Sequence, residues 1–178
     1  MNNNNNNIFV VSTIFLAIIL FITYAIVLLN IMNHFPIEEK NESYFDSPYW
    51  VGISQSLVKC LTIFQIIAAI GYVIWFVNIN YSVSEKTKKI IIVANIIFFV
   101  SSIIWPFTAY YALKNKSMKS ALLSSLCLWI AAISMIILLV RTFTESNETA
   151  IIGILLTSFV VVLIDGVGWT TSIINRVG

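Results

Sequence analysis

The chain has 178 residues, of which 59% are hydrophobic and only 10% are charged, and its mean hydropathy is +0.93. Soluble domains are about 45–50% apolar and about 25% charged, so this composition excludes a protein that folds mainly in water. The formal net charge is only +2, whereas nucleic-acid binding needs clustered Lys and Arg residues. We therefore expect a membrane protein of one domain with no nucleic-acid partner.

Met1 is followed by a run of asparagine from Asn2 to Asn7. Such a polar, low-complexity run is expected to form a disordered poly-Asn tail over residues 1–7. The apolar run that begins at Ile8 is longer than the core of a secretory signal and has no small-residue cleavage site. We therefore expect it to remain as the first membrane span of a single transmembrane helical-bundle domain over residues 8–178.

Five apolar segments are long enough to cross a bilayer. A helix that rises 1.5 Å per residue needs about 20 apolar residues to cover about 30 Å of hydrocarbon. Backbone groups in lipid must be paired within their own segment unless a closed barrel forms, and the alternating strands of a barrel are absent from the sequence. The predicted fold is an all-α integral membrane protein, a bundle of five transmembrane helices at about residues 8–32, 48–79, 90–113, 119–141 and 150–175.

The predicted connections are short except for residues 32–47, which form an acidic loop containing Glu38, Glu39, Glu42 and Asp46. Ser47 followed by Pro48 fits an N-cap and the first residue of a helix, so the second helix is predicted to begin near Pro48. Lys and Arg residues are divided almost evenly between the two sides, and the acidic loop favours an N-terminus inside. The predicted location is an integral, multi-pass position in a membrane that the sequence does not specify.

The first half of the second predicted helix places its polar groups on one face. They follow steps of three and four residues, the spacing of a helical face: Gly52, Gln55, Lys59, Thr62, Gln65 and Ala69. Polar side chains in a span avoid lipid, so this face is expected to turn inward. It is interpreted either as a polar seam packed against neighbouring helices or as the wall of a path for a solute or ion.

Asp165 is the only acidic residue embedded in a predicted span. With a regular helical period it shares a face with Ser158, Gly168, Trp169 and Ser172. An acid at this depth costs about 3 kcal/mol on insertion scales unless it is neutral, paired or hydrated. A compensating interaction is therefore expected.

Lys59 is the candidate partner of Asp165, because both residues are predicted to lie roughly 15 Å from the same membrane surface. We predict that they form a gate or coupling pair. In the alternative interpretation, Lys59 extends along its own helix to the headgroups and Asp165 is neutral because it is desolvated.

Asn95, Ser102 and Pro106 share one face of the third predicted helix. Pro106 lacks a backbone N–H donor, so a helix kink is predicted there. Kinks beside polar residues occur in transporters, but they are also frequent in membrane helices generally. The residues assigned to a path lining or polar seam are Gln55, Thr62, Gln65, Asn95, Ser102 and Ser158.

Small side chains form a ridge on the fourth predicted helix, at steps of four and three residues: Ser120, Ser124, Cys127, Ala131 and Ser134. This spacing is typical of close helix packing. The ridge is interpreted as a contact inside the bundle, with a dimer face as the alternative.

Most catalytic and metal sites lack their residues in this sequence. The single histidine, His34, lies in a predicted loop, and the spans contain only one acid, so a haem site, a His-rich metal site and an aspartic protease dyad have no ligands or partners. Cys60 and Cys127 lie in apolar segments and are interpreted as packed small side chains. We expect no enzyme activity, no metal and no cofactor.

Two functions are consistent with these features. The first is a multi-pass transporter or channel for a small solute, proton or ion, in which Lys59 and Asp165 carry the gating or coupling step. Its partners are the lipid bilayer and further copies of the chain, since five short helices barely enclose a path. The alternative is a non-transporting structural or assembly protein of a cellular or viral membrane, in which the polar groups hold the helices together.

Overall fold

The structure is a computed structural model, and it describes residues 3–34, 55–79 and 83–177. The described chain is entirely helical apart from short connections. Its elements are α1 (Asn3–His34), α2 (Gln55–Ile79), α3 (Glu85–Asn115), α4 (Met118–Glu145), α5 (Glu148–Phe159), the π-helix η4 (Val160–Trp169) and α6 (Thr170–Val177). The last three elements form one continuous helix, which is the fifth span.

Five helices in the described residues are long and apolar enough to cross a membrane: Asn6–Val27, Lys59–Ile79, Glu85–Asn115, Met118–Glu145 and Glu148–Asn175. This confirms the prediction of an all-helical chain with five candidate spans. The sequence predicted them because the apolar runs are much longer than the core helices of soluble domains.

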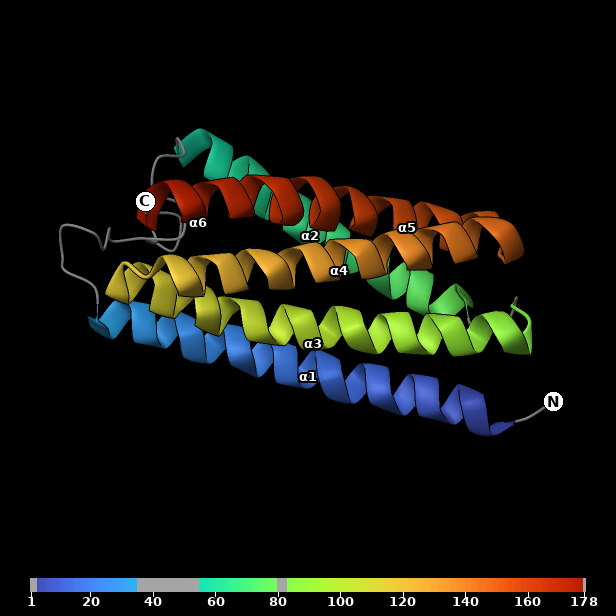
Figure 1. Ribbon diagram of the computed structural model, residues 1–178. Coiled ribbons are helices and arrows are strands. Elements are labelled where there is room, and N and C mark those ends of the chain that lie inside the picture. Colours follow the sequence, from blue (N-terminus) through green and yellow to red (C-terminus); the bar gives the residue numbers. More distant parts are fainter. Residues whose placement is uncertain (1–2, 35–54, 80–82, 178) are drawn as a thin grey trace.

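The helices run lengthwise in a bundle, and the two ends of the chain lie at opposite ends of it (Figure 1). The most extensive contacts join α3 to α4 and α2 to α5, and α1 packs against α3. In Figure 1, α2 crosses obliquely behind the other helices. The α4 helix also contacts α5, η4 and α6, so it lies along the whole fifth span.

The helix ends differ from the predicted boundaries. The α1 helix already begins at Asn3 and ends with His34, so Asn3 to Asn7 are helical where a disordered tail was expected, and His34 belongs to a helix and not to a loop. A physical reason is visible at Asn6, whose Oδ1 accepts a hydrogen bond from the Lys88 ammonium of α3. The predicted acidic residues of the first loop and the predicted start at Pro48 lie outside the described residues.

Polar caps explain the tight connections between the later helices. Ser84, Ser117 and Asn147 are the N-cap residues of α3, α4 and α5, and each side chain accepts a hydrogen bond from a backbone N–H of its own first turn. Such caps satisfy backbone donors that the helix itself leaves unpaired. The C-cap residue of α3 is Lys116, which adopts the left-handed conformation with φ of 47°.

The outer faces of the helices are apolar. Phe21 is 80% exposed and Val11 is 66% exposed, and large aliphatic and aromatic side chains are exposed on all five spans. A soluble monomer rarely exposes such extended apolar surface. This distribution is the one expected where lipid covers the outside of the bundle.

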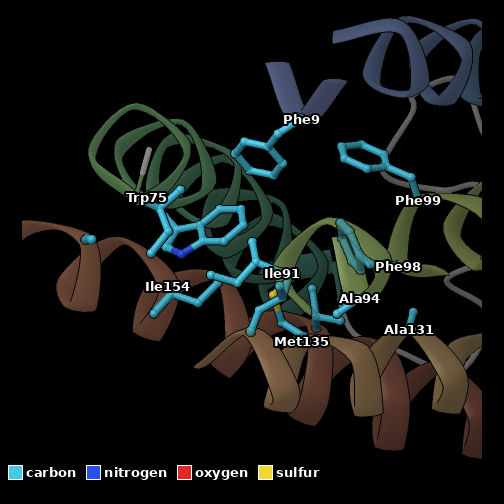
Figure 2. Close-up of a cluster of buried hydrophobic side chains, with 13 residues drawn as sticks. Phe9, Trp75, Ile91, Ala94, Phe98, Phe99, Ala131, Met135 and Ile154 are labelled. Atoms are coloured by element: carbon cyan, nitrogen blue, oxygen red, sulfur yellow. The ribbon is translucent and has the colours of Figure 1, made fainter. Parts of the chain in front are cut away.

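The interior is filled by aromatic and small side chains from several helices. Figure 2 shows a cluster in which Phe9 of α1 faces Trp75 of α2, beside Phe98 and Phe99 of α3. The Phe9 and Trp75 rings meet edge to face with centroids 6.1 Å apart. Trp75 is completely buried, so this cluster links α2 to the rest of the bundle.

Candidate functional site

Asp165 lies in the middle of η4, the π-helical part of the fifth span. In a π-helix each backbone N–H bonds five residues back, and such segments occur frequently at functional sites. Asp165 is half-buried as a residue, but its Oδ1 atom is buried and has no hydrogen-bond partner. A buried carboxyl oxygen without a donor is costly for folding.

Two further buried hydroxyl oxygens of the same span, Ser158 Oγ and Thr170 Oγ1, also have no hydrogen-bond partner. No other buried side-chain nitrogen or oxygen atom in the described residues is unpartnered. We call Ser158, Asp165 and Thr170 the unpartnered set. They occupy the end of α5, the centre of η4 and the first residue of α6, so the unsatisfied polar groups follow one continuous helix, the fifth candidate span.

The surroundings of η4 are apolar. A Cβ atom added to Gly166 would lie 3.4 Å from the Ala132 Cβ of α4, so the backbones of η4 and α4 approach closely beside Asp165. Trp169 packs against Trp105 of α3 with ring centroids 5.7 Å apart. None of the groups in these contacts carries a charge.

The structure does not bring Lys59 and Asp165 together. Lys59 is exposed on α2, and the described residues contain no ion pair between it and Asp165. Lys59 marks the first residue of the second candidate span, where a long side chain can reach the headgroups while its stem follows the helix. The geometry therefore fits the alternative interpretation of Lys59.

The predicted polar face of α2 is only partly turned inward. Thr62 and Gln65 are half-buried, whereas Lys59 and Ala69 are exposed; Gly52 and the side chain of Gln55 lie outside the described part. The buried face of α2 consists instead of Ala68, Gly71, Trp75 and Ile79. Gly71 turns inward because a Cβ atom there would clash with the backbone of α5, and Trp75 and Ile79 turn inward because they fill a hydrophobic cluster; the polar spacing indicated neither contact.

Asn95 of the predicted lining lies at the centre of a hydrogen-bonded network between three helices. Its side chain is fully buried, its Oδ1 accepts from the Tyr72 hydroxyl at 2.6 Å, and its Nδ2 donates to Thr13 Oγ1 at 2.8 Å. Sequence reasoning missed Tyr72 and Thr13. Tyr72 continues the three- and four-residue spacing beyond Gln65 and Ala69, so extending that stripe would have found it.

Trp75 and Thr142 form a second interhelical hydrogen bond that the sequence did not indicate. Trp75 Nε1 donates to Thr142 Oγ1 at 2.9 Å, and that hydroxyl donates to the carbonyl oxygen of Leu138 at 2.8 Å. Both side chains are buried. The bond joins α2 to α4, and no periodic pattern within one helix reports such a pairing.

The third helix stays helical through Pro106, and Ser102 and Pro106 are both buried. The carbonyl oxygen of Trp105 accepts hydrogen bonds from the Thr108 hydroxyl at 2.8 Å and the Ser124 hydroxyl at 3.4 Å. Pro106 removes the backbone donor for the Ser102 carbonyl oxygen, so these bonds to the Trp105 carbonyl do not replace the lost bond. The predicted kink remains a prediction.

The small-residue ridge of α4 lies inside the bundle. Ser124, Cys127, Ala131 and Ser134 are buried and Ser120 is half-buried. Because other helices of the same chain cover this surface, the geometry agrees with the bundle-contact interpretation and leaves no ridge free for a dimer.

The two cysteines differ in environment: Cys127 is buried, as expected for a packed side chain, but Cys60 is exposed on α2. Both are free thiols. No group of three or more His, Cys, Asp or Glu side chains lies close enough to hold a metal ion within the described part of the chain.

A polar cluster forms at the end of the bundle that contains the start of α3 and the end of α4. Glu145 accepts hydrogen bonds from the Ser84 backbone N–H at 3.1 Å and from the Thr87 hydroxyl. Lys88 of the same turn contacts Asn6. These contacts join α1, α3 and α4 at this end of the bundle.

The chain was also compared with known proteins, and no protein family, curated protein or solved structure matches it. Function must therefore be inferred from the geometry. Five apolar helices are compatible with a multi-pass integral membrane protein.

Proposed function

We propose that this protein moves a small solute, proton or ion across a membrane, and that Asp165 is the residue at which the transported species binds. The observation that carries the proposal is the location of the unpartnered set, all of it on the fifth span. Embedded polar groups that only hold helices together find partners, as Asn95 does with Tyr72 and Thr13. Asp165 Oδ1, in contrast, has no hydrogen-bond partner.

The local backbone supports the same proposal. A π-helix is rare, and it costs stability that must be compensated elsewhere in the fold. Here it coincides with the one acid embedded in the described spans. Intramembrane ionisable residues without a structural partner typically mark ion pathways or proton relays.

The role proposed for Lys59 changes with the structure. Since Lys59 is exposed and makes no ion pair with Asp165, the coupling step is assigned to Asp165 alone. Of the predicted lining residues, Ser158 belongs to the unpartnered set, and Asn95 is assigned to helix packing.

The test is flux in liposomes that contain the purified protein, measured for protons with a pH-sensitive dye and for alkali cations with an ion-sensitive dye. The parent protein is expected to conduct or exchange at least one of these ions, and Asp165→Asn is expected to lose most of that flux. Thr171→Val is the matched control, because Thr171 is exposed on the same span and its hydroxyl bonds only the Val167 carbonyl of its own helix. An Asp165→Asn protein that transports like its parent would contradict the proposal.

A non-transporting assembly protein is the second candidate, and the hydrogen bonds between helices favour it. The Tyr72, Asn95 and Thr13 network joins three spans, and Thr157 Oγ1 of α5 donates to the Ala68 carbonyl oxygen of α2 at 3.0 Å. Such bonds act as glue between membrane helices. Under this candidate the parent protein shows no flux, and Asp165→Asn changes only yield or stability.

A further inference from the structure

The chemistry around Asp165 restricts the species that it can bind, and this restriction rests on the proposed transport function. The unpartnered set offers one carboxylate and two hydroxyl groups, so every free donor atom is oxygen. Oxygen ligands suit hard cations, whereas soft metals prefer thiolate or imidazole ligands. No cluster of His, Cys, Asp or Glu side chains surrounds Asp165 in the described residues.

Only one of the three groups carries a charge. Ser158 lies seven residues before Asp165 and Thr170 lies five residues after it, and both side chains are neutral hydroxyl groups. A cation at Asp165 therefore meets a single negative charge from this span.

No neighbouring charge alters that count in the described structure. The elements that pack most extensively against η4 are α2, α4, α5 and α6, and α3 also contacts it through Trp105 and Trp169. The charged residues of these five elements lie near the ends of the helices: Lys59 on α2, Glu85, Lys86, Lys88, Lys89 and Lys114 on α3, Lys119, Arg141 and Glu145 on α4, Glu148 on α5, and Arg176 on α6, whose side chain lies outside the described part. None of the described side chains forms an ion pair with Asp165.

We infer that Asp165 binds one hard monovalent cation at a time, a proton or Na⁺. A bare carboxylate in an apolar environment is costly, and one monovalent cation neutralises it. A divalent cation would leave an uncompensated positive charge in the same environment. If Na⁺ binds there, it competes with the proton for the same carboxylate.

The competition can be measured without any flux. Dicyclohexylcarbodiimide enters lipid and adds to a protonated carboxyl group, whose proton moves to a reagent nitrogen while its oxygen bonds to the reagent carbon. Rearrangement gives a stable acylurea that increases the mass of the Asp165 peptide by one reagent molecule. Labelling in proteoliposomes is followed by mass spectrometry at several pH values, in choline, sodium or calcium chloride of equal ionic strength.

We expect the labelling of Asp165 to fall by about tenfold for each pH unit once the carboxyl is mostly ionised. If Na⁺ is the occupant, Na⁺ at about ten times its dissociation constant lowers labelling by about tenfold relative to choline. If the proton is the occupant, labelling follows pH and ignores Na⁺. Stronger protection by Ca²⁺ than by Na⁺, or labelling that ignores both pH and salt, would overturn the inference.

Two variants test whether the labelling signal comes from the Asp165 carboxyl group. Asp165→Asn removes the carboxyl and is expected to abolish labelling of this peptide, while Asp165→Glu is expected to retain competition by the same cation. Glu148, which is exposed at the start of α5, serves as an internal control for a carboxyl in water. If labelling shows competition but the protein has no flux, the cation site is supported and the transport function is contradicted. If the protein has flux but its labelling ignores pH and salt, the transport function is supported and the cation site at Asp165 is contradicted.

Discussion

Gly71 and Gly153 bring the backbones of α2 and α5 into direct contact. A Cβ atom on Gly71 would lie 2.7 Å from the Gly153 carbonyl oxygen, and a Cβ atom on Gly153 would lie 2.6 Å from the Gly71 carbonyl oxygen. The Thr157 hydroxyl spans the same crossing through its bond to the Ala68 carbonyl. Because glycine has no side chain, the two helices can approach closely enough for contacts between their backbones to hold them together in lipid.

We predict that Gly71→Ala and Gly153→Ala each lower the free energy of unfolding by about 1–3 kcal/mol, because the added methyl groups meet backbone atoms that cannot move away. Gly168→Ala is the control, since its Cβ atom would lie 3.8 Å from the Leu163 carbonyl oxygen, an ordinary van der Waals distance. Unfolding in mixed detergent micelles, followed by tryptophan fluorescence, measures the difference. Equal stability of all three variants would show that α2 and α5 are not in contact.

The Asn95 network gives a prediction about coupling. Asn95→Leu leaves the Tyr72 hydroxyl and Thr13 Oγ1 without their partner, and we expect it to cost about 1–3 kcal/mol of unfolding free energy. Tyr72→Phe removes a donor from the same network. The double variant should therefore lose less stability than the sum of the two single variants. Strict additivity in detergent unfolding experiments would mean that Tyr72 and Asn95 do not interact.

Glu145 is expected to keep the first turn of α3 ordered. Glu145→Ala removes the acceptor for the Ser84 backbone N–H and the Thr87 hydroxyl, so amide hydrogen exchange at Ser84 should become faster while exchange in the middle of α3 stays unchanged. Glu148→Gln is the comparison variant at the neighbouring helix start. If both variants exchange alike at Ser84, the contact does not order this end of α3.

We expect Asp165 to make the folded protein less stable than it would be with an apolar residue at this position. Because its Oδ1 is buried without a partner, Asp165→Leu is expected to raise the unfolding free energy by about 1–3 kcal/mol. The same variant should lose flux and carbodiimide labelling. Thermal unfolding in detergent is the measurement. A large loss of stability on this substitution would instead reveal that the carboxyl has a structural partner.

The sequence could predict the five spans because their signal is local. A span needs a long uncharged apolar run, and each run can be read without knowing any other part of the chain. The boundaries were less accurate: α3 begins at Glu85 and α4 ends at Glu145, beyond the uncharged cores, because capped polar turns extend a helix past its apolar segment. The buried ridge of α4 was predicted for the same local reason.

The candidate site was predicted only in part. Asp165 stood out as the lone embedded acid, and Asn95 and Ser158 were correctly expected to turn inward. The pairing of Lys59 with Asp165 was inferred from equal depth alone, and the structure shows that Lys59 points away from the interior. The predicted face around Asp165 also assumed an α-helical period. The π-helix η4 has a longer period, so Trp169 is buried while Gly168 is exposed.

The amino-acid sequence by itself determined that this chain is a five-span membrane-type helical protein with one acid inside a span, since hydrophobicity and helix length are properties of single segments. Only the tertiary structure decided which helices touch, that Asn95 bonds to Tyr72 and Thr13, and that Asp165 Oδ1 has no partner. The rotation of a helix about its own axis is set by packing against its neighbours. Whether a buried polar atom finds a partner depends on that rotation in two helices at once.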